Sequence, residues 1–284
     1  MDDMSRRSAM APMTLAMLPV CPLAGSVFSL PLPDGMWRMA SASVISAMLL
    51  ILATFSAGRI ARVDLTGGPP AALGLLTGIA CTVCAYPAAM LVSEVMSRCL
   101  PSGAAGLVPV MQAPPWLAWA LLALLPAIAE EMLFRGLLYG SFRRHGFLFA
   151  AVLSAVCFSC VHGSLQQAAY TLLLGLVWAA LRECTGSVWP CVIGHLFFNT
   201  AGLVSAYQAR PLPLTSGEVP ALWPLACFAF AGLFGCGAVM RAAGLRLHDG
   251  DPAESGCHGA LTSAFLAVLA ASANIIANMI LFSA

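Results

Sequence analysis

Six polar residues interrupt apolar stretches of this sequence, and their side chains could activate water and stabilise a developing negative charge. They are Glu130, Glu131, Arg135, His162, His195 and Asn199. On insertion scales, a charged residue at the centre of a membrane helix costs roughly 2.5–3.5 kcal/mol. A chain keeps such residues only if they are paired, buried in protein or exposed to a water-filled cavity, so a cluster of them predicts a functional site.

The two adjacent acids are expected to differ in their partners. Glu131 and Arg135 are four residues apart with the acid first, which is the favourable order for an ion pair on one helix face. Glu130 lies about 100° around the helix and lacks that partner. A desolvated carboxyl group of this kind can act as a general base near neutral pH. Pro126 removes one backbone hydrogen bond, so we expect a kink there that helps to admit water.

The remaining polar residues recur at nearly even intervals. His162 follows Glu130 by 32 residues and His195 follows His162 by 33, while Asn199 shares a helix face with His195. Each interval is close to the length of one helical hairpin, so the three sites could converge in one bundle. Taken singly, such a His or Asn could equally be a hydrogen-bonding contact between helices, and a Glu–Arg pair could be a structural staple.

The composition is that of a membrane protein. Of 284 residues, 60% are hydrophobic and only 9% are charged, whereas soluble domains carry about 25% charged residues. The net charge of +1 offers no basic patch for nucleic acid. We therefore predict an all-α fold, a polytopic membrane helical bundle of about eight transmembrane helices over residues 37–284.

Eight apolar runs are long enough, or nearly so, to cross about 30 Å of hydrocarbon. They are residues 37–60, 70–97, 116–142, 147–162, 165–182, 187–206, 219–241 and 260–283. Residues 1–36 contain five prolines and are expected to be interfacial or poorly ordered, with an additional span over residues 9–32 left open. Arg counts of seven against five in alternate loops do not decide the orientation.

The polar motifs, taken together and in order, resemble the CPBP family of intramembrane proteases, which includes the type II CAAX prenyl endopeptidases and the bacterial Abi-type proteins. The resemblance covers roughly residues 116–206. The motifs that carry it are Glu130-Glu131-x-x-x-Arg135, Phe158-x-x-x-His162 and His195-x-x-x-Asn199, with Phe134-Arg-Gly-Leu-Leu138 and Gly186-Ser-Val-Trp-Pro190 beside them.

This resemblance implies a glutamic-type intramembrane endopeptidase. Glu130 would be the general base that activates water together with His162, and His195 and Asn199 would form an oxyanion hole. Glu131 and Arg135 would hold the helix and orient the site. The substrate would be a membrane-anchored or lipidated protein or peptide within the bilayer, and the composition favours a bacterial inner membrane.

Three alternatives stay open at this point. Zinc could bind at Glu130, His162 and His195, although the sequence contains no His-Glu-x-x-His motif and the glutamic mechanism needs no cofactor. The same residues could form the proton relay of a proton-coupled transporter. The chain could also be a non-catalytic membrane scaffold or immunity protein. The identity of the substrate and the oligomeric state are not predicted.

Overall fold

The computed structural model describes residues 10, 13–29, 35–69, 71–99, 113–162, 164–207 and 222–243. Over these residues, the regular elements are helices, with one isolated β-bridge between Gly67 and Ser187. Three helical stretches, Trp37–Ala61, Ala72–Arg98 and Pro115–His145, are long and apolar enough to cross a membrane, and Phe147–Cys160 and Ala226–Ala242 are shorter apolar helices. The predicted fold class, an all-helical membrane bundle, is confirmed.

The first seven predicted runs coincide with helices, and the eighth, 260–283, lies outside the described residues. The helices are α3 (Met36–Ala61), α4 (Ala72–Cys99), the stretch from α6 to α8 (Pro115–Phe142), α9 (Phe147–Cys160), α10 (Leu165–Thr185), α11 (Trp189–Tyr207) and α12 (Leu222–Ala242). Residues 1–36 contribute α2 (Met17–Phe28). At about 18 Å, α2 is shorter than the hydrocarbon core, and an additional span over residues 9–32 stays a prediction.

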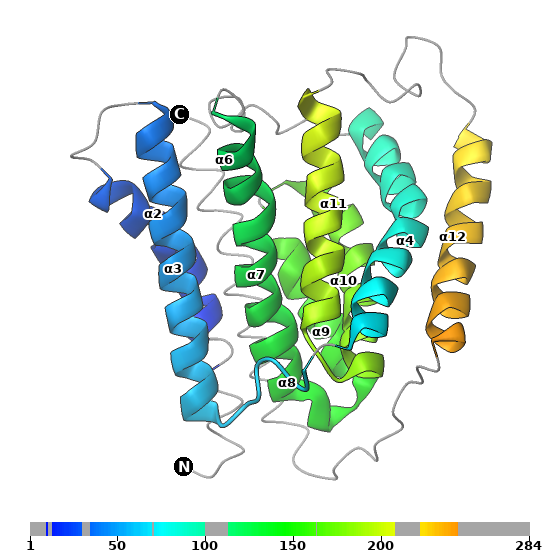
Figure 1. The fold of residues 1–284 in the computed structure, drawn as a ribbon, viewed down its shortest axis with the longest axis horizontal. Coiled ribbons are helices and arrows are strands. Elements are labelled where there is room, and N and C mark those ends of the chain that lie inside the picture. Colours follow the sequence, from blue (N-terminus) through cyan, green and yellow to red (C-terminus); the bar gives the residue numbers. More distant parts are fainter. Residues whose placement is uncertain are drawn as a thin grey trace.

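The helices lie side by side, and two of them organise the arrangement (Figure 1). Helix α4 packs against α10, α11 and α12, while α7 (Leu125–Glu131) packs against both α3 and α11. Small residues allow the close approaches of α4. A Cβ atom added at Gly78 would lie 2.2 Å from the carbonyl oxygen of Pro190, and one at Gly232 would lie 1.9 Å from that of Cys84. Helices α11 and α12 are thus in direct backbone contact with α4.

The stretch that carries the two acids changes its helix type twice. It runs through α6 (Pro115–Trp119), the π-helix η2 (Ala120–Leu124), α7, the π-helix η3 (Met132–Leu138) and α8 (Tyr139–Phe142). Pro126 is near the start of α7, immediately after the first π-helical segment. The kink expected at Pro126 stays a prediction, and the π-helical backbone lies about one turn before it. π-helical turns inside α-helices are frequent at functional sites, and here they flank Glu130 and Glu131.

At one end of the bundle, two connections are tied together. Val188 N–H donates to the Thr66 carbonyl at 2.9 Å, next to the Gly67–Ser187 bridge. The Asp64 carboxylate accepts hydrogen bonds from the backbone of Gly67 and Thr66, and these bonds hold its pKa below the ordinary value. The start of α11, and so the depth of His195, is fixed against the α3–α4 connection.

Candidate active site

Glu131 and Arg135 form a fully buried ion pair. Arg135 Nη1 lies 2.8 Å from Glu131 Oε1, and both side chains have no exposed area. Arg135 Nη2 also donates to the Gly175 carbonyl of α10 at 3.1 Å, and the guanidinium carbon lies 4.4 Å from the centre of the Phe158 ring. The ion pair expected from the four-residue spacing is thus present. The structure adds that it joins η3 to α10.

His195 binds to the same carboxylate oxygen. Its Nδ1 atom lies 3.0 Å from Glu131 Oε1, across the interface between α7 and α11. A carboxylate that is paired with a guanidinium can only accept hydrogen bonds, so Nδ1 must carry the proton. The other ring nitrogen, Nε2, is then directed to Glu130, whose Oε2 atom is 3.9 Å away. Glu131 thereby sets both the tautomer and the direction of the imidazole ring.

Glu130 and Glu131 differ in exposure. The Glu131 side chain is fully buried, whereas 25% of the Glu130 side chain is exposed. Glu131 is therefore enclosed by protein, whereas part of the Glu130 side chain lies at the surface of the bundle. The arrangement separates an acid that orients neighbouring groups from an acid that can exchange a proton.

His162 is joined to this cluster through Phe158. Helix α9 ends at Cys160, and His162 follows in a turn with its Nδ1 atom 2.7 Å from the Phe158 carbonyl oxygen. The Phe158 ring has its centre 4.8 Å from that of His162 and 5.7 Å from that of His195. Electrostatic interactions also link His162 to Glu130 and His195. A position at a helix end is therefore compatible with convergence on Glu130.

Asn199 lies one turn beyond His195 on α11 and is half-buried. The next residue, Thr200, accepts a hydrogen bond from Trp119 Nε1 at 2.9 Å, which holds this part of α11 against the α6 helix. The structure thus places Asn199 on the helix that carries His195. Its amide group is available as a donor.

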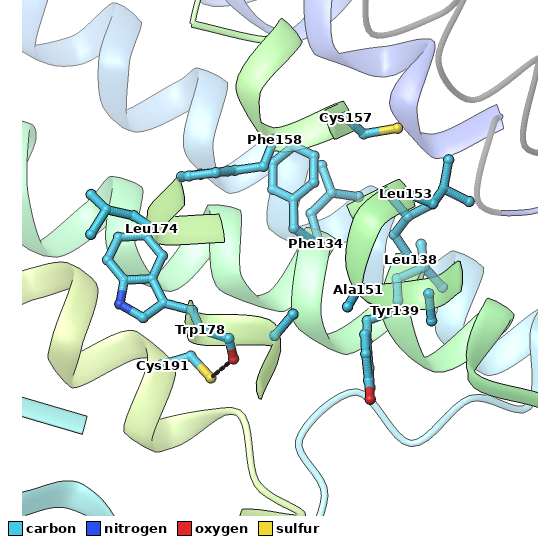
Figure 2. Close-up of a cluster of buried hydrophobic side chains, with 14 of the residues drawn as sticks. Phe134, Leu138, Tyr139, Ala151, Leu153, Cys157, Phe158, Leu174, Trp178 and Cys191 are labelled. Atoms are coloured by element: carbon cyan, nitrogen blue, oxygen red, sulfur yellow. Dashed lines mark hydrogen bonds between the residues drawn. The ribbon is translucent and has the colours of Figure 1, made fainter. Parts of the chain in front are cut away.

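Aromatic residues form one wall of the site, and one of them, Trp178, lies outside the motifs described above. Figure 2 shows Phe158 beside Phe134, and Trp178 with its carbonyl oxygen bonded to Cys191. The Trp178 indole stacks on the His195 imidazole with ring centres 4.5 Å apart and planes 21° apart. A tryptophan in an apolar run is normally predicted to be a core residue. Only the packing of the helices shows which side chain it covers. The indole N–H group of Trp178 is the one feature of the sequence that could indicate a specific contact, because a buried donor needs a hydrogen-bond acceptor.

The positions of Glu130, His162 and His195 can be compared with those required of three zinc ligands. Among the residues that the structure describes, no three His, Cys, Asp or Glu side chains are grouped closely enough to hold one metal ion. The Nδ1 atom of His195 is bonded to Glu131, an arrangement that metal-binding histidines also show, and its Nε2 atom lies 3.9 Å from Glu130 Oε2. The donor set does not fit a zinc site in this arrangement.

Comparison with known proteins identifies the segment that holds these residues. Residues 112–201 match the family model of the type II CAAX prenyl endopeptidases, described as Rce1-like. A protein of Bacillus subtilis (strain 168) named "Putative membrane peptidase YdiL" is 31% identical over 86 residues, which are 30% of this chain and 34% of that protein. The chain thus matches about a third of the length of this curated relative, and no solved structure matches. Residues 112–201, which carry the Glu-Glu, His and His-Asn motifs, are therefore similar to the CPBP and type II CAAX protease family.

Proposed function

We propose that this protein is an intramembrane endopeptidase that hydrolyses a peptide bond of a membrane-anchored or lipidated protein. The observation that carries the proposal is the arrangement of two acids and one imidazole. His195 lies between the buried Glu131, at 3.0 Å, and the partly exposed Glu130, at 3.9 Å. The match of residues 112–201 to the type II CAAX prenyl endopeptidases supports a hydrolytic role for this site.

In the proposed mechanism, Glu130 is the general base. It takes a proton from a water molecule that His162 orients, and the water oxygen attacks the carbonyl carbon of the scissile peptide bond. The bond between carbon and nitrogen then breaks, and Glu130 returns the proton to the departing amine. The exposure of Glu130 supports this assignment, because the base must meet both water and substrate.

His195 and Asn199 are proposed to stabilise the oxyanion that forms on the attacked carbonyl. Donors placed where negative charge develops are worth about 10²–10³ in kcat. Since Nδ1 of His195 already donates to Glu131, a donor role for Nε2 requires a ring with hydrogen on both nitrogens. Glu131 and Arg135 are proposed to orient this ring and to hold α7 in place, without contact to substrate.

The reaction is proposed to need no metal ion. The lack of a three-residue donor group within the described part of the chain supports this reading. The location of the site in a membrane bundle supports a membrane-anchored or lipidated substrate, and a bacterial inner membrane is the proposed location.

The test is a comparison of membrane proteomes from the native host carrying wild-type protein or Glu130→Gln, with new chain termini mapped. We expect a few membrane-anchored proteins to lose a cleaved terminus only in the variant strain. The termini would also name the substrate and the bond cleaved. Unchanged termini, together with a phenotype on deletion, would contradict the proposal and favour a transporter or a scaffold.

A further inference from the structure

We infer that Trp178, on α10, is a positioning residue that fixes the plane of the His195 ring and so aims Nε2 at the reacting group. This inference rests on the proposed function, because it assigns a task within the proposed oxyanion hole. Trp178 contacts His195 but lies outside the three polar motifs. Its role is therefore separate from those that the family motifs assign.

One hydrogen bond does not define the orientation of an imidazole ring. The contact between Nδ1 and Glu131 fixes one corner, and the ring can still pivot about that corner. Nε2 lies on the far side of the ring, so any tilt changes its direction. A flat side chain stacked on the imidazole removes this freedom. Trp178 is stacked in this way, with ring centres 4.5 Å apart and ring planes 21° apart. The Phe158 ring meets the same imidazole nearly at right angles, at 85°.

Trp178 is itself held at both ends. Its Nε1–H group donates to Oγ1 of Thr82 on α4 at 3.1 Å, and the Thr82 hydroxyl donates in turn to the Gly78 carbonyl at 2.9 Å. The Trp178 carbonyl accepts a hydrogen bond from the Cys191 thiol of α11 at 3.1 Å. Thr82, Cys191 and Trp178 are almost completely buried. The indole therefore has one well-defined position between three helices.

Gly194, directly before His195, brings α11 onto this hydrogen bond. A Cβ atom at position 194 would lie 2.5 Å from Thr82 Oγ1 and 3.2 Å from Trp178 Nε1. A side chain there would displace the bonded pair. The α11 backbone next to His195 thus packs directly against the hydrogen bond between Trp178 and Thr82. This contact fixes the position of the imidazole ring relative to the indole ring.

The chain offers matched variants for a test. Thr82→Val removes the acceptor of the indole N–H group at nearly constant volume, and Thr82→Ser keeps it. Thr77→Val is the control, because Thr77 lies on the same helix, is also buried and bonds only to the Leu73 carbonyl. Trp178→Phe keeps a flat ring, whereas Trp178→Leu does not.

The variants are purified in lipid nanodiscs and assayed on a peptide spanning a bond mapped in the native host. We expect Trp178→Leu to lower kcat by about 10²-fold at nearly constant KM, since a small misplacement of a catalytic group can cost that much. Thr82→Val is expected to lose about tenfold in kcat, and Thr82→Ser and Trp178→Phe to recover most of the loss. Each kcat is calculated per folded protein molecule. If Trp178 had a purely structural role, its variants would lower the melting temperature and leave kcat unchanged.

A spectroscopic readout separates failure of this inference from failure of the proposed function. The His195 ring protons, identified by their loss in His195→Gln, should show the ring-current shift of a stacked indole, and Trp178→Leu should abolish it. If Glu130→Gln cleaves as well as wild type, the proposed mechanism is wrong, and if neither protein cleaves the peptide, the proposed function is wrong; in both cases the ring-current shift still reports the stacking. If Glu130→Gln is inactive but Thr82→Val and Trp178→Leu keep full kcat, Trp178 does not position His195.

Discussion

Nδ1 of His195 and Nη1 of Arg135 share a single oxygen of Glu131, at 3.0 and 2.8 Å. One carboxylate therefore joins a guanidinium on its own helix to an imidazole on another. The ion pair between Arg135 and Glu131 alone would stabilise the helix. Because Glu131 also bonds to His195, the pair orients the His195 imidazole at the site. We expect loss of Glu131 to affect both folding and catalysis, whereas Glu130 should affect catalysis alone.

The first prediction concerns the proposed base. Glu130→Gln keeps the shape of the side chain and removes its ability to accept a proton, so cleavage of the peptide substrate should be abolished with little loss of folded protein. Glu94→Gln is the control, because Glu94 pairs with Arg98 near the end of α4, away from the site. Turnover by Glu130→Gln at the wild-type rate would rule out the proposed mechanism.

The second prediction uses two Glu–Arg pairs of equal spacing and different burial. Arg135→Ala strands Glu131 in the bundle and should cost about 3–5 kcal/mol of stability, as removal of one partner of a buried pair does. Arg98→Ala breaks the partly exposed pair with Glu94 and should cost about 0.5 kcal/mol or less. Thermal unfolding in nanodiscs measures both. Equal melting temperatures for the two variants would contradict the structural role of Arg135.

The third prediction concerns the proposed oxyanion donor. Asn199→Ala should lower kcat by about 10²–10³ with little change in melting temperature, because it removes a donor that acts only in the transition state. Ser205→Ala, farther along α11, removes a hydroxyl that bonds only to the Ala201 carbonyl and serves as control. A change confined to KM would show that Asn199 binds substrate without stabilising the oxyanion.

The fourth prediction tests the packing of α4 against α11. Gly78→Ala places a Cβ atom 2.2 Å from the Pro190 carbonyl oxygen, so the helices must separate and stability should fall. Gly74→Ala, one turn earlier, meets nothing closer than 3.5 Å and should be neutral or stabilising by up to about 1 kcal/mol, because Ala favours helices over Gly. Equal melting temperatures for the two variants would mean that α4 and α11 do not approach as described.

The fifth prediction concerns metal ions. Purified protein dialysed against a strong chelator should retain its turnover number, and added Zn²⁺ should not increase it. A loss of activity that Zn²⁺ restores would instead support zinc at Glu130, His162 and His195. Metal content measured on the dialysed sample is the necessary control.

The sequence predicts much of this architecture because its signals are local. Apolar runs set the helices, and the spacing of Glu131 and Arg135 within one helix predicts their ion pair. The π-helical segments η2 and η3 have no comparable signal, because no local spacing of residue types distinguishes a π-helical turn from an α-helical one.

Contacts between helices are harder to predict. The even spacing of Glu130, His162 and His195 indicates convergence, but it does not show that His195 Nδ1 bonds to Glu131 rather than to Glu130. That choice depends on helix rotation and on small residues that bring α4 and α11 together. The stack of Trp178 on His195 has the same origin, because the two residues are neighbours only after α10 and α11 have packed.

The location of Glu131 and Arg135 on one helix has a consequence for biosynthesis. Helices enter the bilayer before they pack against one another, so a charge whose partner lies on a later helix would enter the lipid alone. This pair is neutral from the outset, which lowers the cost of insertion for Pro115–His145. His195 reaches Glu131 only after α11 has been synthesised, so the nascent chain would cross the translocon without a complete site.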